Sequence, residues 1–203
     1  MSENQNPVQA SANPRQAEYP IDPIYLERWS PRSYQGDKPV TDADLFGVLE
    51  AARWAPSANN GQPWRFIVAR TPEDRAVFHG FINPSNLVWC QHAPVLLLLL
   101  SKTTFEANGH PNRKHAFDAG TAWGYLALEA ARKGLSSHAM GGFDAEKARE
   151  ALGISDDYEP QVVISLGYRG AIEQLPEGLQ LREVPSPRKP LAETVIEGHF
   201  PNR

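Results

Sequence analysis

The chain has 203 residues, of which 41% are hydrophobic and 22% are charged, a balance typical of a single globular domain with a sizeable core. Its formal net charge is −4, whereas nucleic-acid-binding domains usually carry a basic excess, so we expect no nucleic-acid partner. Cys90 is the single cysteine, which excludes an intramolecular disulfide and favours a small buried side chain over a catalytic thiol.

The start of the chain has the composition of a tail. The first eighteen residues are polar and lack both the basic start and the apolar run of a signal peptide. We therefore expect a disordered tail over residues 1–20 and one domain over residues 21–203. The longest apolar run, residues 94–100, is too short to span a bilayer. These features predict a cytoplasmic protein without membrane contact.

Helix and strand patterns alternate along the first half of the chain. Residues 22–28 predict a short helix. Thr41 starts a longer helix with Asp44 three residues on, a pair resembling a capping box, and Pro56 ends that helix. Residues 64–69 then predict a strand, and residues 73–81 predict a helix.

The middle of the chain predicts the centre of the domain. Residues 95–100 are continuously apolar, as in a strand buried on both faces. Residues 114–133 predict a long helix stopped by Gly134. Small residues dominate one of its faces, which favours close approach of another helix, inside the subunit or at a subunit contact. That face comprises Phe117, Gly120, Thr121, Gly124, Ala127, Leu128 and Ala131.

The last third of the chain completes the pattern. Residues 136–140 and 161–166 predict strands, with a helix between them capped by Asp144 and stopped by Gly153. The final forty residues are rich in proline, with a short helix after Pro190, and suit an arm that reaches across another subunit. Mixed helices and strands predict a three-layer α+β fold, a sheet between two layers of helices.

Several common sites are absent from the sequence. There is no G-x-G-x-x-G, no P-loop and no G-x-S-x-G nucleophile elbow. The histidines show no zinc-ligand spacing: His110 and His115 are five apart with a proline between them. We expect no metal.

The loop over residues 55–64 is crowded with hydrogen-bonding side chains. Ser57, Asn59, Asn60 and Gln62 lie between two prolines that restrict the backbone. Amides offer donors and an acceptor together, which suits the edge of a flat heterocycle. The composition is equally that of an ordinary turn, so the loop alone decides nothing.

A segment near residue 30 has the composition of an anion site. Arg28, Ser30 and Arg32 alternate, so an extended backbone would point them the same way. Two guanidinium groups and a hydroxyl suit a phosphate, although a solvated charged turn has the same pattern. Arg188 would be a third cation if the C-terminal segment folds back.

A glycine turn lies between the strand over residues 136–140 and the following helix. Gly141 and Gly142 follow Met140 and allow backbone N–H groups to approach a ligand closely. The start of the helix adds partial positive charge. An ordinary strand-to-helix turn would look the same.

In order along the chain, these motifs resemble those of the nitroreductase family of flavin enzymes, from about Tyr25 to Ile196. The shared motifs are an R-x-S-x-R segment, the A-P-S-x-x-N-x-Q-P-W loop over residues 55–64, an apolar strand after an A-P pair, a D-x-G helix, an M-x-G-F-D turn, an L-G-Y strand end and an R-x-P near the C-terminus. The ten-residue loop is the most specific of them.

The resemblance implies an intertwined homodimer with FMN at the subunit interface and a central mixed, mainly antiparallel sheet. It implies that the phosphate and ribityl chain are held by Arg28, Trp29, Ser30, Arg32 and Arg188. It assigns to the isoalloxazine ring, from the partner subunit, Pro56, Ser57, Ala58, Asn59 and Gln62. It places along the ring face Met140, Gly141 and Gly142.

The implied activity is a ping-pong cycle in which NAD(P)H reduces the flavin and a nitroaromatic, quinone or enone reoxidises it. No catalytic side chain is implied, because the flavin carries the chemistry. The alternatives are a flavin carrier or sensor without turnover, and a dehalogenase or flavin-destroying enzyme of the same fold. Two features depart from the family pattern: Gly124 and Tyr125 stand where an asparagine is usual, and residues 101–113 lack the helices that larger members insert.

Overall fold

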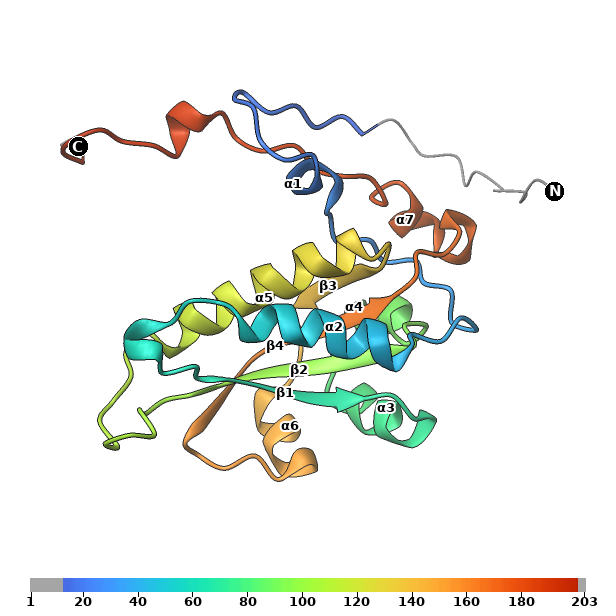
Figure 1. The fold of residues 1–203 in the computed structure, drawn as a ribbon. Coiled ribbons are helices and arrows are strands. Elements are labelled where there is room, and N and C mark those ends of the chain that lie inside the picture. The colour runs from blue at the N-terminus through green and yellow to red at the C-terminus, as the bar shows by residue number, and fades with distance from the viewer. Residues whose placement is uncertain (1–12, 201–203) are drawn as a thin grey trace.

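The computed structural model describes residues 13–200 and has a four-stranded sheet at its centre (Figure 1). The sheet order is β1-β2-β4-β3. Its strands are β1 (Trp64–Ala69), β2 (Val95–Lys102), β3 (Ser136–Met140) and β4 (Tyr158–Gly167). Within the described residues every pairing between these strands is antiparallel, which confirms a mainly antiparallel sheet.

Strand β2 lies between the two hydrophobic cores of the molecule. Its apolar residues alternate between two cores: Leu97 and Leu99 pack in one, and Leu96 and Leu98 pack in the other. Successive side chains of a strand point to opposite faces, so a continuously apolar strand must be covered on both. The prediction of a doubly buried central strand is confirmed.

Helices cover the two faces of the sheet (Figure 1). One face is covered by α2 (Asp42–Arg53) and α5 (His115–Arg132). The other is covered by α3 (Pro72–His79), α4 (Pro84–Cys90) and α6 (Ala145–Leu152). Cys90 lies buried in this second layer, and burial raises the pKa of its thiol to about 12, which suits the predicted apolar role.

The helix ends follow their sequence signals. The Thr41 hydroxyl accepts a hydrogen bond from the Asp44 backbone N–H at 3.1 Å, and the Asp144 carboxylate accepts one from the Lys147 N–H at 3.1 Å. Gly134 and Gly153 both have positive φ, as stop signals after a helix require. Helix α4 had no clear sequence signal, because only Trp89 and Cys90 of its seven residues are buried.

The small-residue face of α5 is only partly packed inside the subunit. The buried stripe of α5 comprises Asp118, Ala119, Ala122, Leu126, Ala127 and Ala130, so only Ala127 belongs to the predicted face. Phe117, on the predicted face, is 75% exposed. Helix α1 (Ile24–Glu27) contacts α5, and Gly124, Leu128 and Ala131 of this face are half-buried, so packing within one subunit accounts for part of the face. A contact between subunits stays a prediction.

Two arms lie side by side above α5 (Figure 1). The first precedes and includes α1 (Ile24–Glu27), and the second follows β4 with η2 (Ile172–Gln174), α7 (Glu177–Gln180) and η3 (Leu191–Glu193). The Leu191 N–H donates to the Glu18 carboxylate at 2.8 Å, joining the arms. The short helix predicted after Pro190 is thus a single 3₁₀ turn.

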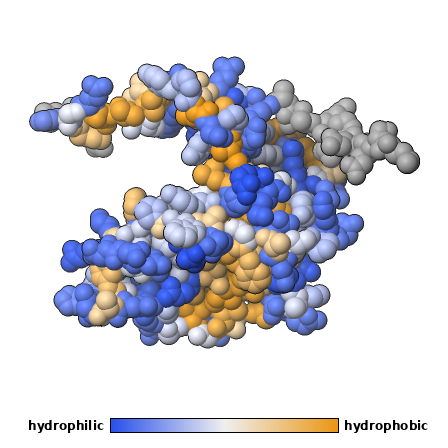
Figure 2. All heavy atoms as spheres, viewed as in Figure 1, coloured by the Kyte–Doolittle hydropathy of each residue, from blue (hydrophilic) through white to orange (hydrophobic). Residues whose placement is uncertain are grey.

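The C-terminal arm exposes large apolar side chains, including Leu191, Val195, Ile196 and Phe200. Figure 2 shows this apolar character along the arm. The predicted disordered tail over residues 1–20 lies mostly outside the described residues, while residues 13–20 pack along the second arm through Arg15 and Glu18. Between residues 13 and 200, no helix has the length and apolar composition needed to cross a membrane.

Candidate functional site

The structure brings the predicted phosphate residues together at one cavity of about 250 Å³. The lining residues are Arg15, Arg28, Trp29, Ser30, Arg32, His138, Arg182, Val184, Ser186 and Arg188. After α1 the backbone turns extended at Arg28, and the Arg28 guanidinium donates to the Ser30 hydroxyl at 3.4 Å. The C-terminal segment folds back far enough for Arg188 to join the lining. We call this cavity the arginine pocket.

The arginine pocket has a large excess of positive charge. Five arginines line it, and within residues 13–200 only Arg32 of these lies near a carboxylate, Glu183, at 3.8 Å. Among the described residues, Arg15, Arg28 and Arg188 form no ion pair. Burial and then repulsion from Arg188 lower the pKa of the Arg28 guanidinium. A partly buried group of arginines with no counter-ion suits a phosphate dianion.

A buried carboxylate next to the arginine pocket holds the Arg28–Arg32 segment by hydrogen bonds. Glu183 is 1% exposed, and its Oε1 accepts hydrogen bonds from the backbone N–H groups of Arg32 and Ser33 at 2.7 and 3.0 Å. Its Oε2 has no hydrogen-bond partner. The carboxylate therefore anchors the C-terminal segment to the Arg28–Arg32 segment. Sequence reasoning missed it because the two partners lie 150 residues apart.

His138 supports the same segment from the sheet. It lies on β3, and its Nδ1–H donates to the Pro31 carbonyl at 3.0 Å. Its ring packs on Trp89, with the centroids 4.7 Å apart. Burial lowers the pKa of His138 to about 4, with Arg32 and Arg28 adding to the effect. The imidazole is therefore neutral at pH 7.

A second cavity of about 320 Å³ adjoins the arginine pocket. Both cavities are lined by Arg28 and Ser30, and the second continues over the small-residue face of α5 at Gly124 and Ala127. Trp123, Leu128 and Ala139 complete its lining. The glycine that departs from the family pattern thus leaves room for a ligand to approach the helix. A ligand with an anionic end and a less polar body fits this arrangement.

Trp29 packs against another side chain as well as lining the arginine pocket. The guanidinium of Arg169 lies over its ring at 4.9 Å from the centroid. Trp29 still lines the arginine pocket. Its position therefore depends on the strand-end residue Arg169 as well as on the Arg28–Arg32 segment.

The loop over residues 55–64 is a strained structure rather than an ordinary turn. Three residues of it that are not glycine have positive φ: Asn59 at 52°, Asn60 at 52° and Gln62 at 44°. Such conformations cost roughly 1 kcal/mol or more each and are concentrated at functional sites. The loop includes η1 (Ala58–Asn60), a single 3₁₀ turn.

Fixed contacts hold this strained loop. The buried Asp118 carboxylate accepts a hydrogen bond from the Ala58 N–H at 3.1 Å. The Ser57 hydroxyl accepts one from the Gln62 N–H at 3.0 Å. The Gln62 side-chain amide donates to the Asn60 carbonyl at 3.0 Å. The aspartate of the D-x-G helix therefore positions the polar loop.

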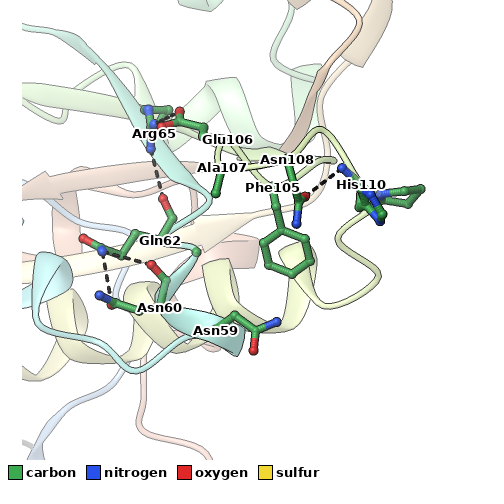
Figure 3. Close-up of a pocket in the computed structure, with 11 residues that line it drawn as sticks. Asn59, Asn60, Gln62, Arg65, Phe105, Glu106, Ala107, Asn108 and His110 are labelled. Atoms are coloured by element: carbon green, nitrogen blue, oxygen red, sulfur yellow. Dashed lines mark hydrogen bonds and ion pairs between the residues drawn. The ribbon is translucent and has the colours of Figure 1, made fainter.

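A hairpin-like loop lies beside the polar loop, and residues of both loops line an open cavity of about 720 Å³ (Figure 3). A bridge pairs Thr104 with Pro111, and the Phe105 N–H donates to the His110 carbonyl at 2.9 Å. The Phe105 ring lies against Gly61, where an added Cβ would come within 3.0 Å of it. In Figure 3 this ring points toward Asn59. The short segment over residues 101–113 thus forms one side of this cavity.

The residues of the glycine turn have different roles. Met140 is buried, with its side chain in the core, so only its backbone is available to a ligand. The Gly142 carbonyl accepts hydrogen bonds from the Asn83 N–H and the Asn86 amide, both at 3.1 Å, and an added Cβ would meet Asn86 at 2.5 Å. The Gly142 carbonyl is therefore occupied by hydrogen bonds within the protein, whereas Gly141 is exposed and unobstructed.

Within one subunit, the polar loop and the arginine pocket lie apart. The loop is held at Asp118 in the first turn of α5, whereas the cavity next to the arginines lies around Ala127. Nine helical residues separate these positions, about 14 Å along the axis. Pro56, Ser57, Ala58, Asn59 and Gln62 line neither cavity that contains Arg28.

The described residues, 13 to 200, contain no group of three or more histidine, cysteine, aspartate or glutamate side chains arranged to hold a metal ion.

We expect Glu183→Ala to lower the free energy of unfolding by about 3 kcal/mol, because two buried N–H groups lose their acceptor. Glu183→Gln keeps an oxygen at that place and should lose less than half as much. Urea unfolding measures both, and Glu193→Ala, at an exposed glutamate, is the control. Equal losses for the two Glu183 variants would show that the charge, not the hydrogen bonds, holds the segment.

We expect the free energy of unfolding to fall as the pH is lowered from about 6.5 to about 4. In that range the unfolded chain protonates His138 and the folded chain does not, so up to about 3 kcal/mol is lost. His138→Asn, which keeps a donor for the Pro31 carbonyl, should flatten the profile of urea midpoints. The exposed His92→Asn should leave it unchanged, and an unchanged slope in His138→Asn would contradict the assignment.

The chain is similar to several known proteins. The nitroreductase family model matches residues 25–87 and 82–168. The chain is 32% identical over 176 residues to a protein named NADH dehydrogenase from Thermus thermophilus, covering 70% of this chain and 83% of that one. It is 28% identical over 151 residues to a putative NADH dehydrogenase/NAD(P)H nitroreductase of Streptomyces coelicolor, covering 65% and 75%.

A solved structure described as an oxidoreductase containing FMN superimposes with a TM-score of 0.89 at 39% identity, covering 96% of this chain and all of that one. The family match spans more than half of the chain, including the Arg28–Arg32 segment, the polar loop and the glycine turn. The chain therefore belongs to the nitroreductase family.

Proposed function

We propose that the protein is an FMN-dependent oxidoreductase that takes electrons from NAD(P)H and reduces a small acceptor such as a nitroaromatic, a quinone or an enone. The observation that carries this proposal is the arginine pocket, in which five arginines face one nearby carboxylate among the described residues and which continues into a cavity along α5. The names of the relatives and the FMN-containing structural neighbour support the same reaction class.

The phosphate of the flavin would be held by Arg28, Ser30, Arg32 and Arg188, because these groups converge on one cavity. Glu183 and His138 would keep that segment in place. Gly124 and Gly141 would let the flat part of the ligand approach the backbone. When bound, the flavin supplies the electron transfer between nicotinamide and acceptor, so no acid, base or nucleophile is assigned to the chain.

The complete site would be formed by two copies of the chain. The polar loop lies away from the arginine pocket in one subunit, while α5 and the C-terminal arm leave small and apolar residues uncovered. A homodimer that buries these surfaces would bring the partner's loop to the flavin ring. Asn59 and Gln62 are both exposed, and their amides would meet the polar edge of the ring.

The acceptor would enter near the polar loop. The open cavity of about 720 Å³ beside Asn59 and Gln62 is also lined by the hairpin-like loop with Phe105. A ping-pong cycle, in which NAD(P)H leaves before the acceptor binds, needs only one such opening. The absence of a nucleotide-binding motif for the nicotinamide cofactor agrees with a shared opening.

We expect purified protein to turn yellow with FMN and to lose its visible flavin band when NAD(P)H is added without oxygen. Arg28→Gln together with Arg32→Gln should stay colourless under the same conditions, because the phosphate loses two of its cations. Absorption spectra before and after reductant measure both. Protein that remains colourless contradicts the proposal, and a yellow protein that NAD(P)H does not bleach indicates a flavin carrier or sensor instead.

We expect complementation between two inactive variants. One chain carries Arg28→Gln and Arg32→Gln, and the other carries Asn59→Asp and Gln62→Glu. If each site uses the arginines of one subunit and the loop of the other, the mixed dimer has one intact site and about half the wild-type activity. Co-expression with two affinity tags isolates this dimer. An inactive mixed dimer would show that both parts serve the same site within one chain.

A further inference from the structure

Arg15 is the least expected member of the arginine pocket. It precedes α1, in the stretch whose composition predicts a tail. Its Nε donates to the Ser186 carbonyl at 2.8 Å, and its Nη1 donates to the carbonyls of Leu26 and Arg28 at 3.1 and 2.6 Å. One guanidinium therefore ties the N-terminal arm to the Arg28 segment and to the C-terminal segment.

The hydrogen bonds leave the charge of Arg15 uncompensated. All three acceptors are neutral carbonyls, and among the described residues Arg15 forms no ion pair. Its Nη2 makes no hydrogen bond within the same residues. Burial, then repulsion from Arg188 and Arg28, lowers the pKa of the Arg15 guanidinium. Arg15 thus brings a further cation close to two cations that already repel each other.

If Arg15 only held the two arms together through hydrogen bonds, its positive charge would not be needed. An amide side chain could donate to carbonyls without adding to the repulsion within the pocket. A cation held beside other cations becomes favourable once a dianion binds between them, because each guanidinium then forms charge-assisted hydrogen bonds. The free donor capacity at Nη2 is available for such a ligand.

We propose that Arg15 binds the phosphate group of the flavin, so that the N-terminal arm forms part of the cofactor site. This rests on the proposed function. Binding of the phosphate would also fasten the two arms, since the same guanidinium holds Ser186. The contact concerns only the phosphate end, so Arg15 should distinguish FMN from riboflavin, which has the same ring and ribityl chain without the phosphate.

The test compares the Kd of FMN and of riboflavin, measured by fluorescence titration, in full-length wild type and variants. Arg15→Gln keeps side-chain donors and removes the charge, and Arg15→Lys keeps the charge and removes the planar fork. The control is Arg53→Gln, whose exposed partner is Glu50. Thermal melting of each variant reports whether the arms stay packed.

We expect Arg15→Gln to raise the Kd of FMN about tenfold, the usual effect of losing one hydrogen bond to a charged group, with the Kd of riboflavin unchanged. Arg15→Lys should lie between Arg15→Gln and wild type. An equal rise in the Kd of both ligands, or no rise in either Kd, overturns the proposal. Arg15 would then have only the structural role of holding the arms together. Wild type that binds neither flavin overturns the proposed function itself, an outcome separate from any behaviour of the variants.

Discussion

The burial of β2 on both faces is the constraint on which the structure depends. Because its side chains alternate between two cores, helices must cover both sides of the sheet, and α5 lies across one of them. Helix α5 then holds both parts of the candidate site. Asp118 near its start fixes the polar loop, and Gly124 and Ala127 in its middle line the cavity next to the arginines. The spacing along this helix separates the two parts within one chain.

Electrostatics decides the character of the arginine pocket. Five arginines around one cavity are unfavourable in the absence of an anion, and Glu183 offsets only part of that charge while it binds two backbone N–H groups. The neutral His138 holds Pro31 without adding a charge. The protein therefore uses neutral or buried partners to position the Arg28–Arg32 segment, and leaves the pocket with an excess of positive charge for a ligand.

Much of the fold followed from local patterns. The strands over residues 64–69 and 136–140 agree with prediction to the residue, because each is a short run between clear turn signals. Helix α4 was missed because it is short and only its C-terminal end is buried. The composition of α5 did not tell which of its sides meets the sheet, since alanine and glycine occur on both sides of that helix.

Sequence patterns alone predicted the layered fold, the family motifs and the candidate phosphate residues Arg28, Ser30 and Arg32, because these depend on neighbours within a few residues. The folded chain alone reveals that Arg15 and His138 line the arginine pocket and that Glu183 holds the Arg28–Arg32 segment beside it. It also reveals that the Gly142 carbonyl is hydrogen-bonded within the protein while Gly141 stays open. Distance along the chain explains why sequence patterns did not predict these contacts. Contacts such as the one from Glu183 to Arg32 join segments about 150 residues apart and leave no periodic signal in either.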